Sequence, residues 1–190
     1  MKTTIHITKK DLDKDNYYKE DGIGTYSEPF DAEIISDENL GYIRFKEGVY
    51  VTGGITIKAG SGIEAGWGIE AGYGIKVGDG IEAGDGIKAG WGIEAGYGIK
   101  AGDGIEAGDG IEAGWGIEAG DGIVSLYSYI KAKLSIDFST TISAGIFSTS
   151  GAKDIEAREI NGKVIYGNVI LLKDTEKTIT IDGKDIKISE

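Results

Sequence analysis

The chain of 190 residues is poor in the side chains on which most enzymes and metal sites depend. It contains no cysteine and only one histidine, His6. The absence of cysteine excludes disulfide bonds, thiol catalysis and cysteine ligands to a metal, and one histidine cannot supply the several ligands usual for zinc. Motifs for a serine nucleophile or a phosphate-binding loop are also missing from the sequence. The sequence therefore predicts a protein that is not an enzyme and that uses no metal ion and no cofactor.

Long apolar runs are absent as well. No stretch of about 18 consecutive apolar residues occurs, and the first fifteen residues lack the apolar segment of a signal peptide. From this we expect a cytoplasmic protein. Its net charge of −12 argues against direct binding to nucleic acid or to an anionic membrane, and it favours a basic partner.

Glycine is abundant and strictly periodic. Of its 33 glycines, 22 lie in residues 57–122, where the hexad Ile-Glu/Lys-Ala-Gly-X-Gly is written eleven times, with Val77 as the one exception to alanine at position three. Two glycines in every six residues exclude an α-helix, because each costs about 1 kcal/mol relative to alanine. Collagen needs glycine at every third position, so the spacing of four and two excludes it too.

The hexads predict an all-β fold. Ile, a charged residue and Ala alternate as in a half-buried strand, and Gly-X-Gly supplies a flexible corner. A fixed short period is typical of stacked repeats. We therefore predict a parallel β-solenoid (β-helix) of hexapeptide repeats, with Ile and Ala inward, Glu and Lys outward, and X at the corners. Three hexads per coil would resemble the left-handed β-helix of hexapeptide-repeat acyltransferases, although X is often Trp or Tyr where that family has a small residue.

The length of one coil, 12 or 18 residues, stays open at this point. Position X repeats as Trp, Tyr, Asp, Asp, which gives a super-period of 24 residues and favours twelve. One face of a twelve-residue coil would stack like charges, which is unfavourable. That face would carry Glu70, Glu82, Glu94, Glu106 and Glu118, and one corner would stack Trp67, Asp79, Trp91, Asp103 and Trp115.

Three regions follow from the pattern. Residues 1–50 contain strand-like runs at 3–8, 31–36 and 42–45, and we assign them to an N-terminal β cap and entry coil, because an open solenoid end exposes unpaired strand edges. Residues 51–147 form the solenoid, and residues 148–190 form a C-terminal β-hairpin unit. In that unit Asn161-Gly162 and Asp182-Gly183 each separate two strand-like runs, which predicts two hairpins with type I′ turns.

The candidate binding residues are the acids and aromatics of the hexads. Their seven Glu and five Asp against four Lys give the repeat a net charge of −8. Glycine-flanked aspartates resemble those of the nonapeptide calcium β-rolls, but the period differs and Trp or Tyr interrupts them. Aromatic residues often anchor interfaces. The predicted binding residues are Glu70, Asp79, Glu82, Asp85, Glu94, Asp103, Glu106, Asp109, Glu118, Asp121, Trp67, Trp91, Trp115, Tyr73 and Tyr97.

A rigid acidic rod resembles, in its physical logic, the pentapeptide-repeat DNA mimics. A small, acidic, cysteine-free chain with such a repeat is also similar to phage or mobile-element inhibitors of the anti-CRISPR kind. The resemblance implies a protein–protein interaction with a basic surface of a CRISPR or other nucleic-acid-binding complex in the host cytoplasm, and an oligomer could form through the solenoid ends or caps. The alternative function is a structural, fibre or assembly protein in which the solenoid is a rigid spacer.

Overall fold

The computed structural model describes residues 3–36, 38–133, 135–151, 153–172, 177–181 and 184–188. Nearly all of its regular structure is β-strand, and a single 3-10 turn, η1 (Lys9–Asp11), is the one helical element in this part of the chain. Within these ranges no helix has the length and apolar character needed to cross a bilayer. The all-β prediction is confirmed.

The strands are short in the repeat and longer toward the C-terminus. Most hexad strands cover three residues, Ile to Ala, and most Gly-X-Gly segments lie between strands; β6 is longer and begins at Ser61. The strands are β1 (Thr3–His6), β2 (Ala32–Ser36), β3 (Gly41–Phe45), β4 (Val49–Val51), β5 (Ile55–Ile57), β6 (Ser61–Ala65), β7 (Ile69–Ala71), β8 (Ile75–Val77), β9 (Ile81–Ala83), β10 (Ile87–Ala89), β11 (Ile93–Ala95), β12 (Ile99–Ala101), β13 (Ile105–Ala107), β14 (Ile111–Ala113), β15 (Ile117–Ala119), β16 (Ile123–Ser125), β17 (Ile130–Ala132), β18 (Ser135–Ala144), β19 (Asp154–Ala157), β20 (Glu159–Tyr166), β21 (Asn168–Leu171), β22 (Lys177–Ile181) and β23 (Lys184–Ile188).

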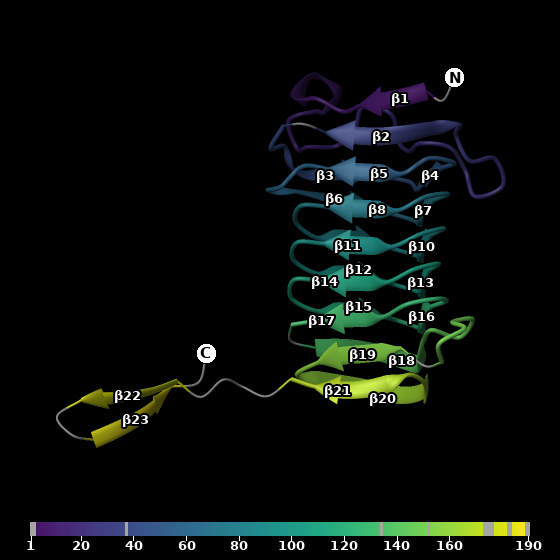
Figure 1. Ribbon diagram of the computed structural model, residues 1–190. Coiled ribbons are helices and arrows are strands. Elements are labelled where there is room, and N and C mark those ends of the chain that lie inside the picture. Colours follow the sequence, from purple (N-terminus) through teal and green to yellow (C-terminus); the bar gives the residue numbers. More distant parts are fainter. Residues whose placement is uncertain are drawn as a thin grey trace.

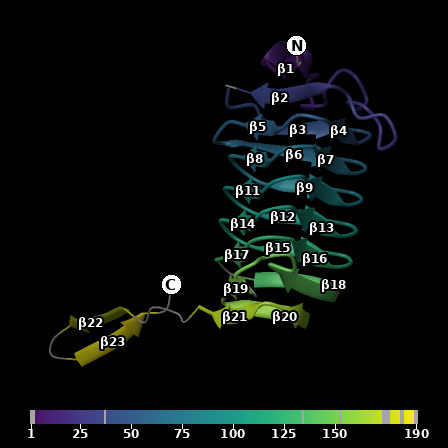
Figure 2. The same cartoon turned by 45° about the vertical axis from the view of Figure 1, so that its right-hand side comes forward.

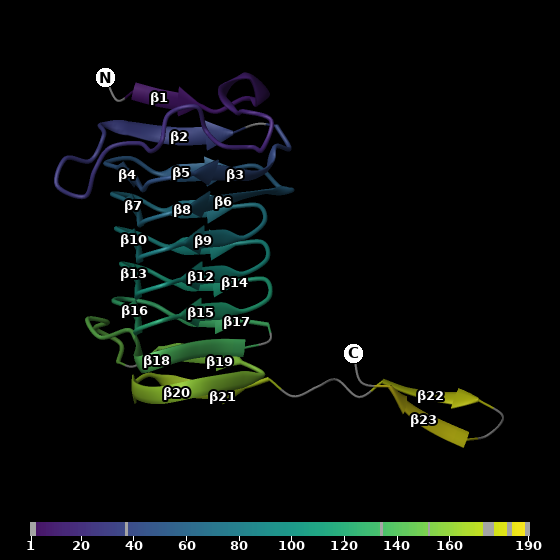
Figure 3. The ribbon, with the colours of Figure 1, turned by 180° about the vertical axis from the view of Figure 1, so that it is seen from behind.

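The strands stack into a parallel β-solenoid with three faces (Figure 1). Face 1 carries β5, β8, β11, β14, β17 and β19, face 2 carries β6, β9, β12 and β15, and face 3 carries β7, β10, β13 and β16. Face 2 and its neighbours are seen in the rotated view of Figure 2 and from behind in Figure 3. Within each face every strand pairs in parallel with the strand one coil earlier and one coil later.

One coil therefore contains eighteen residues, and the preference for twelve is wrong. Ile99 pairs with Ile81 on one side and Ile117 on the other, eighteen residues away in each direction. The 24-residue super-period of the X residues suggested a coil of twelve, but it does not match the coil length: the cycle spans four hexads, and one coil contains three. Successive residues at one corner therefore follow the four-residue cycle in reverse order (Tyr, Trp, Asp, Asp), with Ser61 and Asp121 as exceptions.

The core is a column of isoleucines closed by alanines. Every hexad isoleucine is at most 3% exposed, and the position-three residues from Ala65 to Ala119 are at most 4% exposed, whereas Ala59 of the first hexad and the charged position-two side chains lie outside. The inward and outward assignment made from the sequence is confirmed. Burying an isoleucine contributes about 1.5–3 kcal/mol, and the same residue recurs on three faces, so the stack has one continuous apolar axis.

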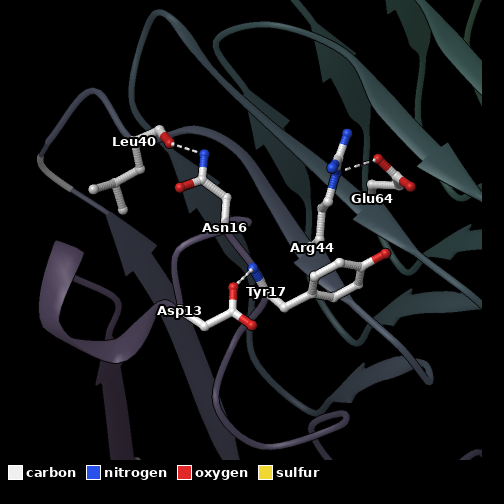
Figure 4. A network of polar contacts seen from close by, with 6 residues as sticks. All are labelled: Asp13, Asn16, Tyr17, Leu40, Arg44 and Glu64. Carbon is white, nitrogen blue, oxygen red and sulfur yellow. Dashed lines mark hydrogen bonds and ion pairs between the residues drawn. The ribbon is translucent and has the colours of Figure 1, made fainter.

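Residues before the first regular coil cover its open strand edges. Tyr17 forms a parallel bridge with Arg44 of β3, Ile23 with Val49 of β4, and β2 pairs with β5. Figure 4 shows how this cap is fixed: Asn16 donates to the carbonyl oxygen of Leu40 (3.1 Å), and the backbone N–H of Tyr17 donates to Asp13 (2.9 Å). Arg44 pairs in turn with Glu64 at 3.0 Å.

The solenoid continues past residue 147, where the sequence pattern placed its end. Strands β19 and β21 extend face 1, and β20 pairs in parallel with β18. The hairpin predicted at Asn161-Gly162 is wrong, because both residues lie inside the single strand β20, at a register shift against β18. The extended edge of β18 provides a partner along the whole segment, which outweighs the local turn preference.

The second predicted hairpin is confirmed in its strands. β22 and β23 pair antiparallel in a separate two-stranded sheet, with Ile181 opposite Lys184. Asp182 and Gly183, the proposed turn residues, lie outside the described residues.

Candidate functional site

The X residues occupy three corners that run along the solenoid axis, one before each face. Backbone hydrogen bonds join most successive X residues along the corners, for example from the N–H of Trp115 to the carbonyl oxygen of Tyr97 (2.8 Å). Corner 1 precedes face 2, corner 2 precedes face 3, and corner 3 precedes face 1. They contain Ser61, Asp79, Tyr97 and Trp115 (corner 1), Trp67, Asp85, Asp103 and Asp121 (corner 2), and Tyr73, Trp91 and Asp109 (corner 3).

Corner 2 gathers three carboxylates into one column, which we name the acidic edge: Asp85, Asp103 and Asp121. The N–H of Asp103 donates to the carbonyl oxygen of Asp85, and that of Asp121 to Asp103, each at 3.3 Å. Stacked coils place these side chains ~4.8 Å apart. None of the three carboxylates forms an ion pair within the described ranges. The other two predicted aspartates, Asp79 and Asp109, stand alone at corners 1 and 3.

The aromatic corners form stacked pairs one coil apart. The rings of Tyr73 and Trp91 have centroids 5.0 Å apart and an interplanar angle of 25°, and those of Tyr97 and Trp115 lie 5.5 Å apart at 14°. Trp91 and Trp115 each stack on the tyrosine eighteen residues earlier. Trp91 is 59% exposed and Trp115 51% exposed, so each pair presents an indole surface to solvent. Trp67 stands at corner 2 beside the acidic edge.

The five glutamates that a twelve-residue coil would stack on one face are distributed over all three faces, so that prediction is wrong. Glu82 and Glu118 lie on face 2, Glu70 and Glu106 on face 3, and Glu94 on face 1.

Three of these glutamates pair with lysines one coil earlier. The distances are 2.8 Å for Lys76–Glu94, 3.3 Å for Lys88–Glu106 and 3.2 Å for Lys100–Glu118. The hydrogen bond and charge of Glu106 raise the pKa of Lys88. These exposed pairs contribute little stability, about 0–1 kcal/mol each. They neutralise three of the glutamates on the faces, whereas the three carboxylates of the acidic edge have no ion-pair partner among the described residues.

Each face also carries a groove along the axis, between the corner side chains and the charged side chains of position two. The grooves have volumes of about 320, 530 and 490 Å³ on faces 2, 3 and 1. Glycines at position six of the hexad form their floors. The face-2 groove, as we name it, is lined by Tyr42, Tyr97, Gly98, Lys100, Trp115 and Gly116.

Three tyrosines of the protein itself fill the ends of these grooves, and sequence reasoning missed them. Tyr42 lies against Gly62 and Gly80 on face 2, Tyr50 against Gly48 and Gly68 on face 3, and Tyr129 against Gly110 on face 1. Burial raises the pKa of the Tyr42 and Tyr129 hydroxyls. A signal was present in the sequence, since all three tyrosines lie at positions where the hexad register would place a charge or a glycine.

Among the residues that the structure describes, no group of three or more His, Asp or Glu side chains could hold a metal ion. Comparison of the chain with protein-family models, with curated proteins and with solved structures found no match. The fold, a three-faced β-solenoid, therefore defines the class of protein, and the surface features that bear on function are its corners and grooves.

Proposed function

We propose that this protein is a non-enzymatic interaction protein that occupies a basic, nucleic-acid-binding surface of another protein. The concrete case is an inhibitor, carried by a phage or mobile element, of a host defence complex such as a CRISPR nuclease. The observation that carries the proposal is the acidic edge. Its three carboxylates repeat every ~4.8 Å, and one strand of duplex DNA presents a phosphate about every 3.4 Å.

The eighteen-residue coil brings the charge density of the whole repeat close to that of DNA. Eleven hexads make about 3.7 coils, or ~18 Å of axis at ~4.8 Å per coil. A net charge of −8 over that length is about one charge per 2.2 Å, compared with about one per 1.7 Å in the duplex. Because the coils are fixed by backbone hydrogen bonds, these charges are already in place before a partner binds.

The acidic edge is tested with two triple variants of equal charge. Asp85→Asn/Asp103→Asn/Asp121→Asn removes the edge, and Asp79→Asn/Glu82→Gln/Asp109→Asn removes three acids elsewhere. Binding to a dodeca-arginine peptide is measured by titration calorimetry at 50 and 200 mM salt. Three exposed charge pairs at 0.2–1 kcal/mol each predict about tenfold weaker binding for the edge variant, and a smaller salt dependence. Equal weakening by both variants would show that only net charge matters and would contradict the proposal.

The inhibitory role is tested by competition. A purified RNA-guided nuclease holding a fluorescent duplex target is titrated with the protein, and release of the duplex is followed by anisotropy. We expect the wild-type protein and the scattered variant to release DNA, and the edge variant to fail. A protein that leaves the duplex bound across a panel of such complexes is not an inhibitor of this kind.

A structural function, with the solenoid as a rigid spacer, is the second candidate, and the uninterrupted isoleucine column favours it. The exposed tryptophans distinguish the two. Trp91→Ala is expected to lower the free energy of unfolding by only about 0.5–1.5 kcal/mol, the value of an aromatic pair. In an interaction protein it should weaken partner binding by about 2 kcal/mol, more than Trp67→Ala or Trp115→Ala. Unchanged affinity in the competition assay for all three variants would favour the spacer.

A further inference from the structure

The two glycines of each hexad are under different constraints. At position four a side chain is impossible: a Cβ at Gly102 would lie 2.9 Å from the carbonyl carbon of Gly84 and closer still to its oxygen. At two of the position-six glycines, Gly98 and Gly116, there is room. A Cβ at Gly98 would meet only the Gly116 carbonyl oxygen, at 3.5 Å, and a Cβ at Gly116 would approach Ser135 no closer than 3.4 Å. Packing therefore explains glycine at position four but not at Gly98 and Gly116.

The retention of these two glycines keeps the floor of the face-2 groove bare. Gly98 and Gly116 lie directly before β12 and β15, and a glycine-to-alanine change that the backbone accommodates stabilises a protein by roughly 0.4–1 kcal/mol, so a fold selected for stability alone would place alanine there. Beside this floor stands the stacked pair Tyr97–Trp115, and the Lys100–Glu118 ion pair forms the opposite wall. The result is a slot of about 320 Å³ between an aromatic wall and a charged wall.

Tyrosine side chains of the protein itself already pack on position-six glycines. The ring of Tyr50 occupies the space where a Cβ of Gly48 would be, and its hydroxyl accepts a hydrogen bond from the N–H of Gly68 at 3.2 Å. Tyr50 is only 8% exposed in this position. On face 2 itself Tyr42 lies in the same way against Gly62, with ring carbons 2.7–2.9 Å from the Cβ position. A phenol ring packed on position-six glycines also occurs on face 1, where Tyr129 lies against Gly110, so the fold uses this packing mode on all three faces.

The open part of the face-2 groove presents the same donor group. Gly98 and Gly116 are equivalent to Gly68 in the repeat, and their N–H groups donate to no acceptor in the part of the chain that the structure describes. Since Gly68 directs its N–H outward to the Tyr50 hydroxyl, the repeat directs those of Gly98 and Gly116 into the groove. The groove offers a hydroxyl-bearing ring both a flat contact and a hydrogen-bond donor.

We propose that the face-2 groove binds a tyrosine side chain of a partner protein. Its ring lies on Gly98 and Gly116 next to the Tyr97–Trp115 pair, continuing the row that Tyr42 begins, and its hydroxyl accepts a hydrogen bond from a glycine N–H. This inference does not depend on the acidic edge, which lies at corner 2 between faces 2 and 3: Asp85 and Asp103 line the groove of face 3, and none of the three aspartates lines the face-2 groove.

Amide chemical shifts of the ¹⁵N-labelled protein test the site directly. The probes are N-acetyl-tyrosinamide, N-acetyl-phenylalaninamide and p-cresol. We expect the tyrosine probe to shift the amide resonances of Gly98 and Gly116 saturably, and to bind roughly two- to tenfold more tightly than the phenylalanine probe, the usual effect of one hydrogen bond. Equal affinity of the two amides overturns the proposal. Binding of p-cresol alone would mean that the groove excludes a peptide backbone, which overturns the partner.

Two matched glycine variants complete the test. Gly98→Ala covers the groove floor with a methyl group in ordinary contact, so the melting temperature should be unchanged while affinity for the tyrosine probe falls at least fivefold. Gly86→Ala makes the same change on face 3 and should leave the face-2 response intact. Retained binding in Gly98→Ala, or an equal loss in both variants, shows that the probe does not lie on the face-2 floor.

Discussion

Replacing Gly102 by alanine is expected to destabilise the solenoid by about 3 kcal/mol or more, at the upper end of the range for overpacking. The added methyl group would lie against the backbone of Gly84, one coil earlier, with its carbonyl carbon at 2.9 Å. A backbone group cannot rotate away as a side chain can. The same coil is also held from both sides by hydrogen bonds, such as that from the N–H of Gly102 to the carbonyl oxygen of Ala83 (3.0 Å).

The control for this prediction is four residues away in the same coil. Gly98→Ala adds the same methyl group where the nearest atom is 3.5 Å distant, and it also reduces the entropy of the unfolded chain. Thermal unfolding followed by far-ultraviolet circular dichroism should therefore show a large loss for Gly102→Ala and no loss for Gly98→Ala. Similar melting temperatures for the two variants would contradict the assignment of position four as the stacking contact.

The sequence was sufficient to predict which side chains face inward. Isoleucine and alanine alternate with a charged residue, and this alternation is typical of a strand with one buried and one exposed face. The corners were also predictable, because a residue between two glycines is outside the stacked strands in every hexad except the first, where Ser61 begins β6. These features are local, and each hexad contains all the information needed.

The coil length was not predictable in the same way, because it depends on which hexads become neighbours. Both twelve and eighteen residues keep isoleucine on isoleucine. The side-chain pairs distinguish the two coil lengths. A coil of eighteen residues places Lys88 beside Glu106 and Tyr73 beside Trp91, whereas a coil of twelve would stack five glutamates. Pair complementarity at a separation of eighteen was therefore a stronger signal than the period of the corner residues.

The candidate site was predicted in composition but not in arrangement. The five hexad aspartates looked equivalent in the sequence, yet only Asp85, Asp103 and Asp121 share a corner. The third member of this group is present because the Trp, Tyr, Asp, Asp cycle of the X residues is broken at position 121, where it would place tyrosine and the chain has aspartate. Tyr42, Tyr50 and Tyr129 escaped notice because their role depends on glycines in a neighbouring coil, not on their own strand.

The second large effect is expected in the isoleucine column. Ile99→Ala should lower the free energy of unfolding by about 2–5 kcal/mol, the range for deleting a large buried aliphatic side chain. Ile99 is 1% exposed and lies between Ile81 and Ile117 in the stack. The cavity cannot collapse, because the backbone hydrogen bonds of the adjacent coils fix their spacing at ~4.8 Å.

A graded series makes this prediction quantitative and separates core from surface in a single coil. Ile99→Val removes one methyl group and should cost about 0.5–1.5 kcal/mol. Lys100→Ala removes the next side chain along, whose exposed ion pair with Glu118 is 3.2 Å long, and should cost at most about 1 kcal/mol. Chemical denaturation of the three variants gives the comparison.

In a stacked array the coils contact mainly their neighbours, so Ile99→Ala at the centre should also speed hydrogen exchange in β9, β12 and β15 before other strands. Uniform exchange along the whole stack would show that the solenoid opens as one cooperative unit instead.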